Sequence, residues 1–222
     1  MELEIKNENL DICSECGGMC CIKCGCDYAI SDFHDHSYAA LLNEISKGDK
    51  SIVAMINFKT LNNGKFVAEH TLYIRARNVN RDIIDLISMK TRCSLLEDNG
   101  CSYDYEHRPF GGKNLKPVRC NEGMCEPIIS PLSILEGWKP YQKQLSKIVR
   151  YYTGKSVMEK ISEDVEELFY RNLIQDYEGV SVLEYVDLKG FIQLLKKAYP
   201  CEYERAFNRR SKLSFARVLN KK

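Results

Sequence analysis

The sequence predicts an α+β fold, in which a small cysteine-rich metal-binding domain with short antiparallel strands precedes a helical part. Two observations predict it. Ten of the 11 cysteines lie before residue 126, and the chain beyond residue 131 carries apolar residues at helical spacing. We therefore predict a cysteine-cluster domain over residues 1–130 and a helical domain or subdomain over 131–222, ending in a basic tail.

The balance of charge and hydropathy excludes several classes of protein. Lys plus Arg total 32 and Asp plus Glu total 31, so the net charge is +1 and we do not expect nucleic acid as a partner. No run of about 18 apolar residues is present, so we expect no membrane span. The acidic N-terminus does not resemble a signal peptide, which predicts a cytoplasmic location.

The N-terminal half alternates short predicted elements. Residues 32–46 predict a helix with Ser31 or Asp32 as its N-cap. Residues 51–58 and 65–75 are rich in β-branched and aromatic side chains on either side of an Asn-Gly pair, which predicts a β-hairpin. A short helix is expected over 80–89.

A second pair of strands is predicted around the turn at residues 98–100. The strands would span 93–97 and 101–105, bringing Cys93 and Cys101 close together across the ladder. The segment 107–131 is rich in proline and glycine, which indicates a loop ordered by its own cysteines.

Helical patterns dominate the C-terminal half. One helix is expected over 133–152, and two capping-box patterns, Ser156 to Glu159 and Ser181 to Glu184, predict the start of two more. From Arg205 to the end there are seven basic residues and no acidic one. This tail is either a solvated helix face or a docking surface for an acidic partner.

The cysteine pattern favours metal ligation over a disulfide framework. The count of 11 is odd and Cys20 and Cys21 are adjacent, which fits disulfides poorly; disulfides remain the alternative if the protein is secreted. The spacing of Cys13 and Cys16 lets two thiolates converge on one ion. Ten cysteines are candidate ligands: Cys13, Cys16, Cys20, Cys21, Cys24, Cys26, Cys93, Cys101, Cys120 and Cys125.

Ten thiols exceed the four that one zinc ion or one cluster needs, so more than one metal atom is expected. Adjacent cysteines suit a polynuclear centre, which favours an iron-sulphur cluster, 4Fe-4S ahead of 2Fe-2S. The alternative is zinc, in more than one ion. Cys201 lies far from both groups and is left out.

The chain resembles the CxxCxxCC family, also called the YkgJ-like cysteine-cluster family and described as a zinc- or iron-chelating domain. Three stretches between residues 13 and 125 carry the resemblance: Cys13-Ser-Glu-Cys16-Gly-Gly-Met-Cys20-Cys21, Arg92-Cys93-Ser-Leu-Leu, and Gly100-Cys101-Ser-Tyr-Asp-Tyr105-Glu106-His-Arg108-Pro109 with Cys120 beyond. The spacing departs from the family pattern between Cys16 and Cys20, and Cys24, Cys26 and Cys125 are additional.

The resemblance implies metal binding and adds Tyr105, Glu106 and Arg108 as residues that flank the centre. The Arg108 guanidinium would offset the charge of the thiolates or bind the Glu106 carboxylate. Tyr103 and Tyr105 would lie on the same face of a strand and shield the site from water. Three histidines close to the cysteines, His34, His36 and His107, and two carboxylates, Asp27 and Asp32, are weaker candidates whose alternative roles are helix capping and solvation.

Two classes of function stay open. The first is a metal-binding module with cysteine-ligated iron-sulphur, for electron transfer or interaction, or its zinc-binding structural counterpart. The second is a metal-dependent enzyme acting on a peptide or protein; flagellin lysine-N-methylase carries a similar cluster, which makes lysine N-methylation a possibility by analogy. Nucleotide-binding and serine-hydrolase motifs are absent from the sequence.

Overall fold

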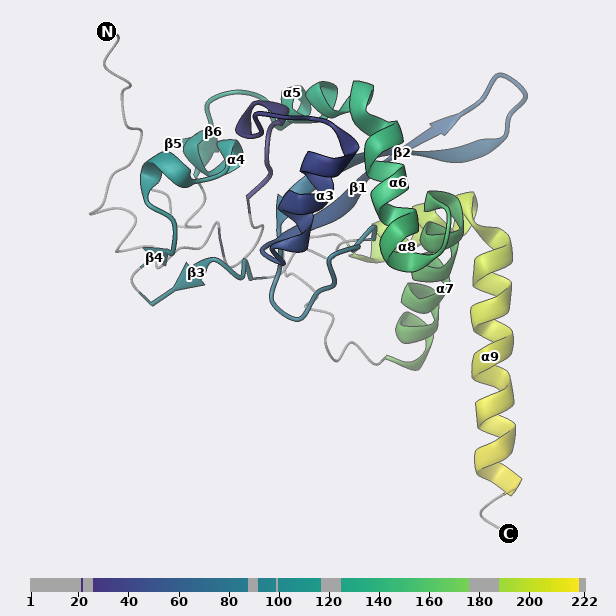
Figure 1. Ribbon diagram of the computed structural model, residues 1–222. Helices are drawn as coiled ribbons and strands as arrows, with labels where there is room; N and C mark the ends of the chain where they lie inside the picture. The colour runs from purple at the N-terminus through teal and green to yellow at the C-terminus, as the bar shows by residue number, and fades with distance from the viewer. Residues whose placement is uncertain are drawn as a thin grey trace, which may run out of the picture.

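The computed structural model describes residues 21, 26–87, 92–98, 100–116, 125–175 and 188–219 (Figure 1). It is a mixed helix and strand fold, as the sequence predicts. Its longer elements are the strands β1 (Lys50–Thr60) and β2 (Phe66–Ala76) and the helices α3 (Tyr38–Ser46), α5 (Pro131–Trp138), α6 (Gln142–Thr153), α7 (Val157–Ile174), α8 (Leu188–Ala198) and α9 (Pro200–Leu219). Short elements connect them.

The predicted hairpin is confirmed, and it is longer than expected at the β1 side. β1 and β2 pair antiparallel from Lys50 opposite Ala76 to Thr60 opposite Phe66. Gly64 turns the chain at φ +80°, a conformation that side-chain-bearing residues rarely adopt. The open end of the hairpin is buried, and its tip projects away from α4 (Phe110–Lys113) (Figure 1).

The helix expected over 32–46 begins later, at Tyr38. Ser37 caps it, because the Ser37 hydroxyl accepts a hydrogen bond from the Ala40 amide at 3.3 Å. The predicted caps were wrong, since Ser31 and Asp32 belong to a separate 3-10 turn, η1 (Ile30–Asp32). The carboxylate of Asp32 is engaged elsewhere in the fold.

The helix expected over 80–89 is wrong for its described part, 80–87. This segment lies along β1: the Ile52 amide donates to the Ile83 carbonyl at 2.8 Å, and the Ala54 amide to the Leu86 carbonyl at 3.3 Å. The edge of β1 therefore satisfies these backbone groups, and pairing with a neighbour overrides the local helical pattern.

The second pair of strands is shorter than predicted. β3 (Leu96–Glu97) and β4 (Gly100–Cys101) cover two residues each. The described residues of the segment expected to be a loop, 107–116 and 125–131, contain α4 and another short pair, β5 (Leu115–Lys116) and β6 (Glu126–Pro127), which are regular elements that the composition does not indicate.

The C-terminal half is helical. The single helix expected over 133–152 is divided into α5 and α6, because Pro140 lies between them in a 3-10 turn, η3 (Lys139–Tyr141). The first capping box is confirmed at the start of α7, where Ser156 and Glu159 bond each other's backbone amides. The second, Ser181 to Glu184, lies outside the described residues.

One hydrophobic core joins residues from both sides of residue 130. Trp138 and Phe169 from the helices are buried together with Ile52 and Ile74 from the hairpin. Gln142 on α6 bonds both backbone groups of Leu72, each at 2.8 Å. Within the described part of the chain, no helix is both long and apolar enough to cross a membrane.

Candidate metal centre

Half of the predicted ligands can be placed. Cys21, Cys26, Cys93, Cys101 and Cys125 belong to the described residues. The other five predicted ligands lie outside them: Cys13, Cys16, Cys20, Cys24 and Cys120.

Three of the placed cysteines, Cys26, Cys93 and Cys101, lie in one corner of the fold, named the cysteine corner below. Cys26 belongs to an extended segment on the free edge of β2, where its carbonyl accepts a hydrogen bond from the Ala76 amide at 2.8 Å. Cys93 bridges to Asn78, just beyond β2. Cys101 ends β4. The segments that carry Cys26 and Cys93 thus both pair with the chain at or just after β2.

The two cysteine groups of the sequence are joined at this corner. The Cys93 amide donates a hydrogen bond of 2.7 Å to the Cys21 carbonyl. Burial raises the pKa of the Cys93 thiol, and the nearby Cys101 raises it further, whereas backbone hydrogen bonds from Leu95 and Cys26 oppose this rise. Residues 67 positions apart in the sequence, Cys26 and Cys93, therefore interact directly.

The route by which Cys93 meets Cys101 differs from the prediction. We expected the two residues to face each other across a ladder, but Cys101 pairs with Leu96. Because β3 begins only at Leu96, Cys93 is free to pair with Asn78 instead. Cys93 and Cys101 are therefore near each other, as predicted, although they do not pair across the ladder.

Two glycines shape the corner, and sequence reasoning assigned them no role. A Cβ atom on Gly111 would lie 2.7 Å from the backbone nitrogen and oxygen of Asp27, and one on Gly112 would lie 3.0 Å from the Cys26 sulphur. The Gly111 amide also donates to the Asp27 carbonyl at 2.8 Å. Only glycine lets α4 approach this closely; the Gly-Gly pair after Arg108-Pro109 was the available signal.

A polar network borders the corner. The Tyr103 hydroxyl donates to the Asp49 carboxylate, and the Lys50 ammonium donates to it at 3.0 Å. Burial alone would raise the pKa of Asp49, but the hydrogen bonds from Tyr103 and Lys50 bring it below its ordinary value. Burial, followed by the Asp49 hydrogen bond, raises the pKa of Tyr103 to about 12. Tyr103 is therefore a neutral donor at physiological pH.

An open cleft of about 430 Å³ reaches this network from outside. Aromatic, basic and acidic side chains line it: Tyr28, Asp32, Phe33, Glu44, Lys50, Ser102, Tyr103, Asp104 and His107. Lys50 is compensated by Asp49 and by Glu44, which lies 3.4 Å from its ammonium. The lining contains none of the three cysteines; it approaches the cysteine corner through Ser102, the residue after Cys101.

The predicted flanking residues lie beyond β4. Tyr105 and Glu106 form a 3-10 turn, η2 (Tyr105–His107), so the expectation that Tyr103 and Tyr105 share one strand face is wrong. The Arg108 Nε donates to the Tyr103 carbonyl at 3.3 Å, and its guanidinium lies 5.8 Å from the centre of the Tyr105 ring. Arg108 thereby holds the chain that carries Tyr103.

The weaker candidates have structural roles in the fold. His36 Nε2 bonds the carbonyls of Ile30 and Phe33, at 3.0 and 2.8 Å. His107 is exposed and bonds Asp104.

The two carboxylates are also engaged, and His34 is exposed at the surface. Asp27 pairs with Arg75 at 2.7 Å. Asp32 accepts from the Phe110 amide at 2.9 Å, which ties η1 to the start of α4.

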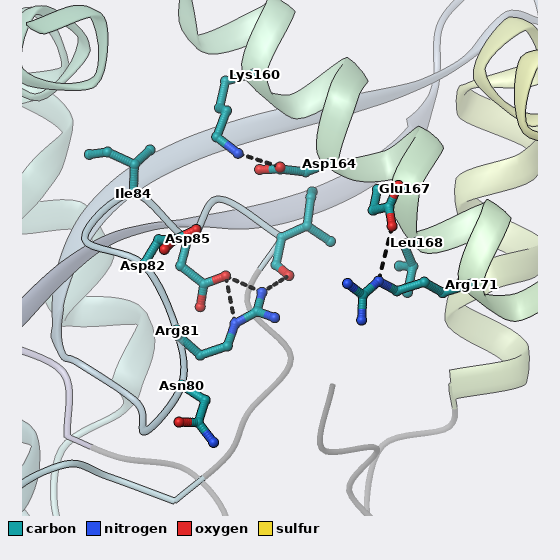
Figure 2. A pocket seen from close by; sticks show the side chains of 11 residues that line it. Asn80, Arg81, Asp82, Ile84, Asp85, Lys160, Asp164, Glu167, Leu168 and Arg171 are labelled. Carbon is teal, nitrogen blue, oxygen red and sulfur yellow. Dashed lines mark hydrogen bonds and ion pairs between the residues drawn. The ribbon is translucent and has the colours of Figure 1, made fainter. Parts of the chain in front are cut away.

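A second pocket, of about 160 Å³, lies between residues 80–87 and α7 (Figure 2). Arg81 bonds Asp85 there, Lys160 bonds Asp164, and Arg171 bonds Glu167 at 3.1 Å. Burial raises the pKa of Asp164, and the charge of Asp85 adds to the rise. Each of these three ion pairs joins residues of one segment, either within 80–87 or within α7, so the pairs neutralise the charges that line the pocket without connecting its two sides.

Among the described residues, no three His, Cys, Asp or Glu side chains form a group that could hold a metal ion. Cys26, Cys93 and Cys101 are not in disulfides, and Cys201 is an exposed thiol on α9. Comparison of the chain with protein-family models, with curated proteins and with solved structures found no match.

Proposed function

We propose that the protein binds a cysteine-ligated iron-sulphur cluster and serves as an electron-transfer or interaction module. One observation carries the proposal: Cys26 from the first cysteine group and Cys93 and Cys101 from the second lie in one corner, although they come from distant parts of the sequence. Distant thiols that are not paired in disulfides and that come near one another are typical of a metal centre, which here needs further ligands, because the described residues alone form no group that could hold a metal ion.

The chemistry of the donor set supports iron-sulphur. The corner offers thiols, and the nearby histidines and Asp27 are bound to other groups or exposed. A cluster needs four thiolates, so ligands from outside the described residues would complete it, drawn from Cys13, Cys16, Cys20, Cys24 and Cys120. The adjacent Cys20 and Cys21 favour a 4Fe-4S centre over 2Fe-2S, and zinc in more than one ion is the alternative.

Anaerobic purification followed by iron, zinc and acid-labile sulphide analysis tests the proposal. We expect iron and sulphide in equal amounts, a broad absorption band in the visible range and an electron paramagnetic resonance signal after one-electron reduction. Colourless protein that holds zinc without sulphide would contradict the iron-sulphur assignment and support the zinc alternative. Protein with neither metal, after reconstitution with iron and sulphide under reducing conditions, would contradict metal binding altogether.

The cleft favours a second candidate, a metal-dependent enzyme acting on a peptide or protein. It is lined by Tyr28, Lys50 and Tyr103 and by Ser102, the residue after Cys101, so a ligand in it would approach a metal held by Cys101 that kept an open coordination position. Adding cyanide or azide to the metal-loaded protein separates the two candidates. A changed metal spectrum favours the enzyme, whereas an unchanged spectrum favours a fully ligated module.

A further inference from the structure

The inner half of the hairpin has both of its edges occupied by extended backbone. Along β2, the Tyr28 amide donates to the Ile74 carbonyl at 2.9 Å, and the Ala76 amide donates to the Cys26 carbonyl at 2.8 Å. Along β1, residues 83–86 bond the strand edge in the same way. Short strand-like segments of the chain therefore pair with this sheet on either side of it, over the part nearest the core.

The next outward-facing residue of β2, Leu72, is bonded by a side chain instead. The Gln142 amide oxygen accepts a hydrogen bond from the Leu72 amide, and the Gln142 amide nitrogen donates to the Leu72 carbonyl, each at 2.8 Å. A primary amide carries the same donor and acceptor as a peptide group. Gln142 thus takes the place of one strand residue and ends the occupied part of the β2 edge.

Beyond Leu72 the edge of β2 is open. Outward-facing residues alternate along a strand, so Ile74 and Leu72 are followed by His70, Ala68 and Phe66, which are named the open edge below. Within the part of the chain that the structure describes, no hydrogen bond reaches the outward backbone groups of the open edge. The tip that follows it extends past α6 (Figure 1).

The open edge lacks the usual protection against strand pairing. The register of β1 and β2 continues without a bulge to Thr60 opposite Phe66, and no proline interrupts β2. The charges of Lys59 and Glu69 neutralise each other across the strands. Proteins ordinarily blunt an exposed edge with a bulge, a proline or charged side chains, so a regular open edge is suited to accept another strand.

The strand that carries the open edge is held in place by α8 and the residue that follows this helix. The Phe66 ring stacks on Phe58 with ring centres 5.8 Å apart, and Phe191 of α8 packs edge-on against Phe58 at 6.2 Å. The Tyr199 hydroxyl bonds the His70 ring at 2.6 Å. An edge that is already ordered costs a partner less on binding.

The surroundings of the open edge are basic. Lys197, in the last turn of α8, has its ammonium 6.0 Å from the centre of the Phe66 ring, and Lys65 directly precedes β2. Both lysines are exposed, and neither forms an ion pair with a described residue. Alternate side chains of an added strand would lie on the face that α8 covers, near Lys197. Acidic side chains would complement it, whereas the hairpin of a second copy would bring like charges together.

We propose that the open edge of β2 binds an extended, acidic segment of a partner protein as an added strand. Main-chain hydrogen bonds to the open edge would provide the attachment, and acidic side chains that face Lys197 would provide the selectivity. The inference goes beyond the proposed metal centre and does not depend on it, because Cys26 pairs with the opposite end of β2, at Ala76.

The probe is a short peptide of alternating glutamate and valine with blocked ends, titrated into isotope-labelled, full-length protein. We expect the amide resonances of Ala68 and His70 to shift and their exchange with solvent to slow, because both amides would donate to the peptide. A peptide with lysine in place of glutamate should bind about tenfold more weakly or less. Equal binding of the two peptides would overturn the acidic assignment.

Variants separate the backbone from the charge. Ala68→Pro removes an outward amide without removing a bond to β1, so the protein should fold and should bind the glutamate peptide about tenfold more weakly. Ala68→Ser keeps the amide and should bind as wild type does. Lys197→Gln should weaken binding and reduce its dependence on salt. A folded Ala68→Pro protein that binds like wild type would overturn the role of the open edge.

Hydrogen exchange of wild type alone decides the question if Ala68→Pro fails to fold. In the free protein the amides of Ala68 and His70 should exchange rapidly at every protein concentration, and the glutamate peptide should protect them. Slow exchange at every concentration would assign the edge to the chain's own residues, and slow exchange at high concentration alone would assign it to a second copy. Either result would overturn the proposal, as would a glutamate peptide that leaves both amides unprotected.

Discussion

The backbone amide of Cys93 donates a hydrogen bond of 2.7 Å to the carbonyl of Cys21. This bond connects the two cysteine groups of the sequence through the main chain, independently of any side chain. A ligand set drawn from both groups would therefore be aligned by backbone pairing before a metal binds, and loss of a cysteine from either group should affect the same centre.

Replacing Cys26 or Cys93 with serine should remove most of the bound metal in either case, because each would take one thiolate from a shared centre. Cys201→Ser is the matched control, since Cys201 is exposed on α9 and lies apart from the cysteine corner. Metal analysis and visible absorption of the three variants provide the measurement. Equal metal content in Cys93→Ser and Cys201→Ser would contradict ligation at the corner.

Gly111→Ala should destabilise the fold by about 1–3 kcal/mol, the usual cost of forcing atoms into a packed region. The new methyl would lie 2.7 Å from the Asp27 backbone, which cannot move aside as a side chain can. In Gly137→Ala the new methyl meets side-chain atoms, the Cγ2 methyl of Ile30 at 3.2 Å and its Cβ at 3.8 Å, and alanine favours helix α5. Denaturant midpoints of the two variants should differ accordingly; equal midpoints would argue against the close approach of α4.

Gln142→Ala should cost about 1–3 kcal/mol of unfolding free energy, because it leaves both backbone groups of buried Leu72 without partners. Lys143→Ala, at the next and exposed position of α6, should change stability by less than about 0.5 kcal/mol. Urea unfolding followed by circular dichroism measures both. A Gln142→Ala protein as stable as wild type would show that Gln142 does not fasten α6 to the hairpin.

His70 should make stability depend on pH near neutrality. Burial lowers the pKa of His70 from its ordinary value of 6.5, so the unfolded chain binds a proton that the folded chain does not. Its contribution is therefore complete above about pH 6.5 and is lost as the pH falls below that value. Melting temperatures between about pH 7.5 and about pH 5.5 should fall less steeply in His70→Gln than in wild type. Identical slopes would contradict this role.

Arg205→Ala should lower stability by at most about 1 kcal/mol, and the effect should shrink in high salt, because its ion pair with Glu166 is partly exposed. Arg209 pairs with Glu167 in the same way. Thermal unfolding at low and high salt measures the effect. A larger, salt-independent loss would indicate that Arg205 acts through packing.

Local signals explain which elements could be predicted from the sequence. The hairpin depends on β-branched residues flanking an Asn-Gly turn, and α7 on a capping box of four residues, so both were found. The helix expected at 80–89 failed because the Ile83 and Leu86 carbonyls bond the edge of β1, which is distant in sequence. The sequence of one segment does not show that it pairs with a strand far away in the chain.

In the candidate site, too, features with a local sequence signal could be predicted, and features set by contacts between distant residues could not. Residue type and spacing identified the cysteines, and the closeness of Cys93 and Cys101 was anticipated for the wrong reason, a ladder that the structure replaces with the Asn78 bridge. The Gly-Gly pair after Arg108-Pro109 was visible in the sequence, but the role of Gly112 was not, because it depends on the Cys26 sulphur that faces this glycine. The side chains around a residue are a property of the fold, and one sequence without contacts does not reveal them.

Trp138 is the only tryptophan in the chain and is fully buried, with its indole nitrogen 2.8 Å from the Tyr28 carbonyl. The protein thus contains a single tryptophan, and the residue to which its indole is hydrogen-bonded, Tyr28, lies two positions after Cys26 in the sequence. Because an iron-sulphur cluster absorbs where tryptophan emits, energy transfer would quench this fluorescence on loading. Loading and loss of the proposed cluster could then be followed in real time in the unlabelled protein.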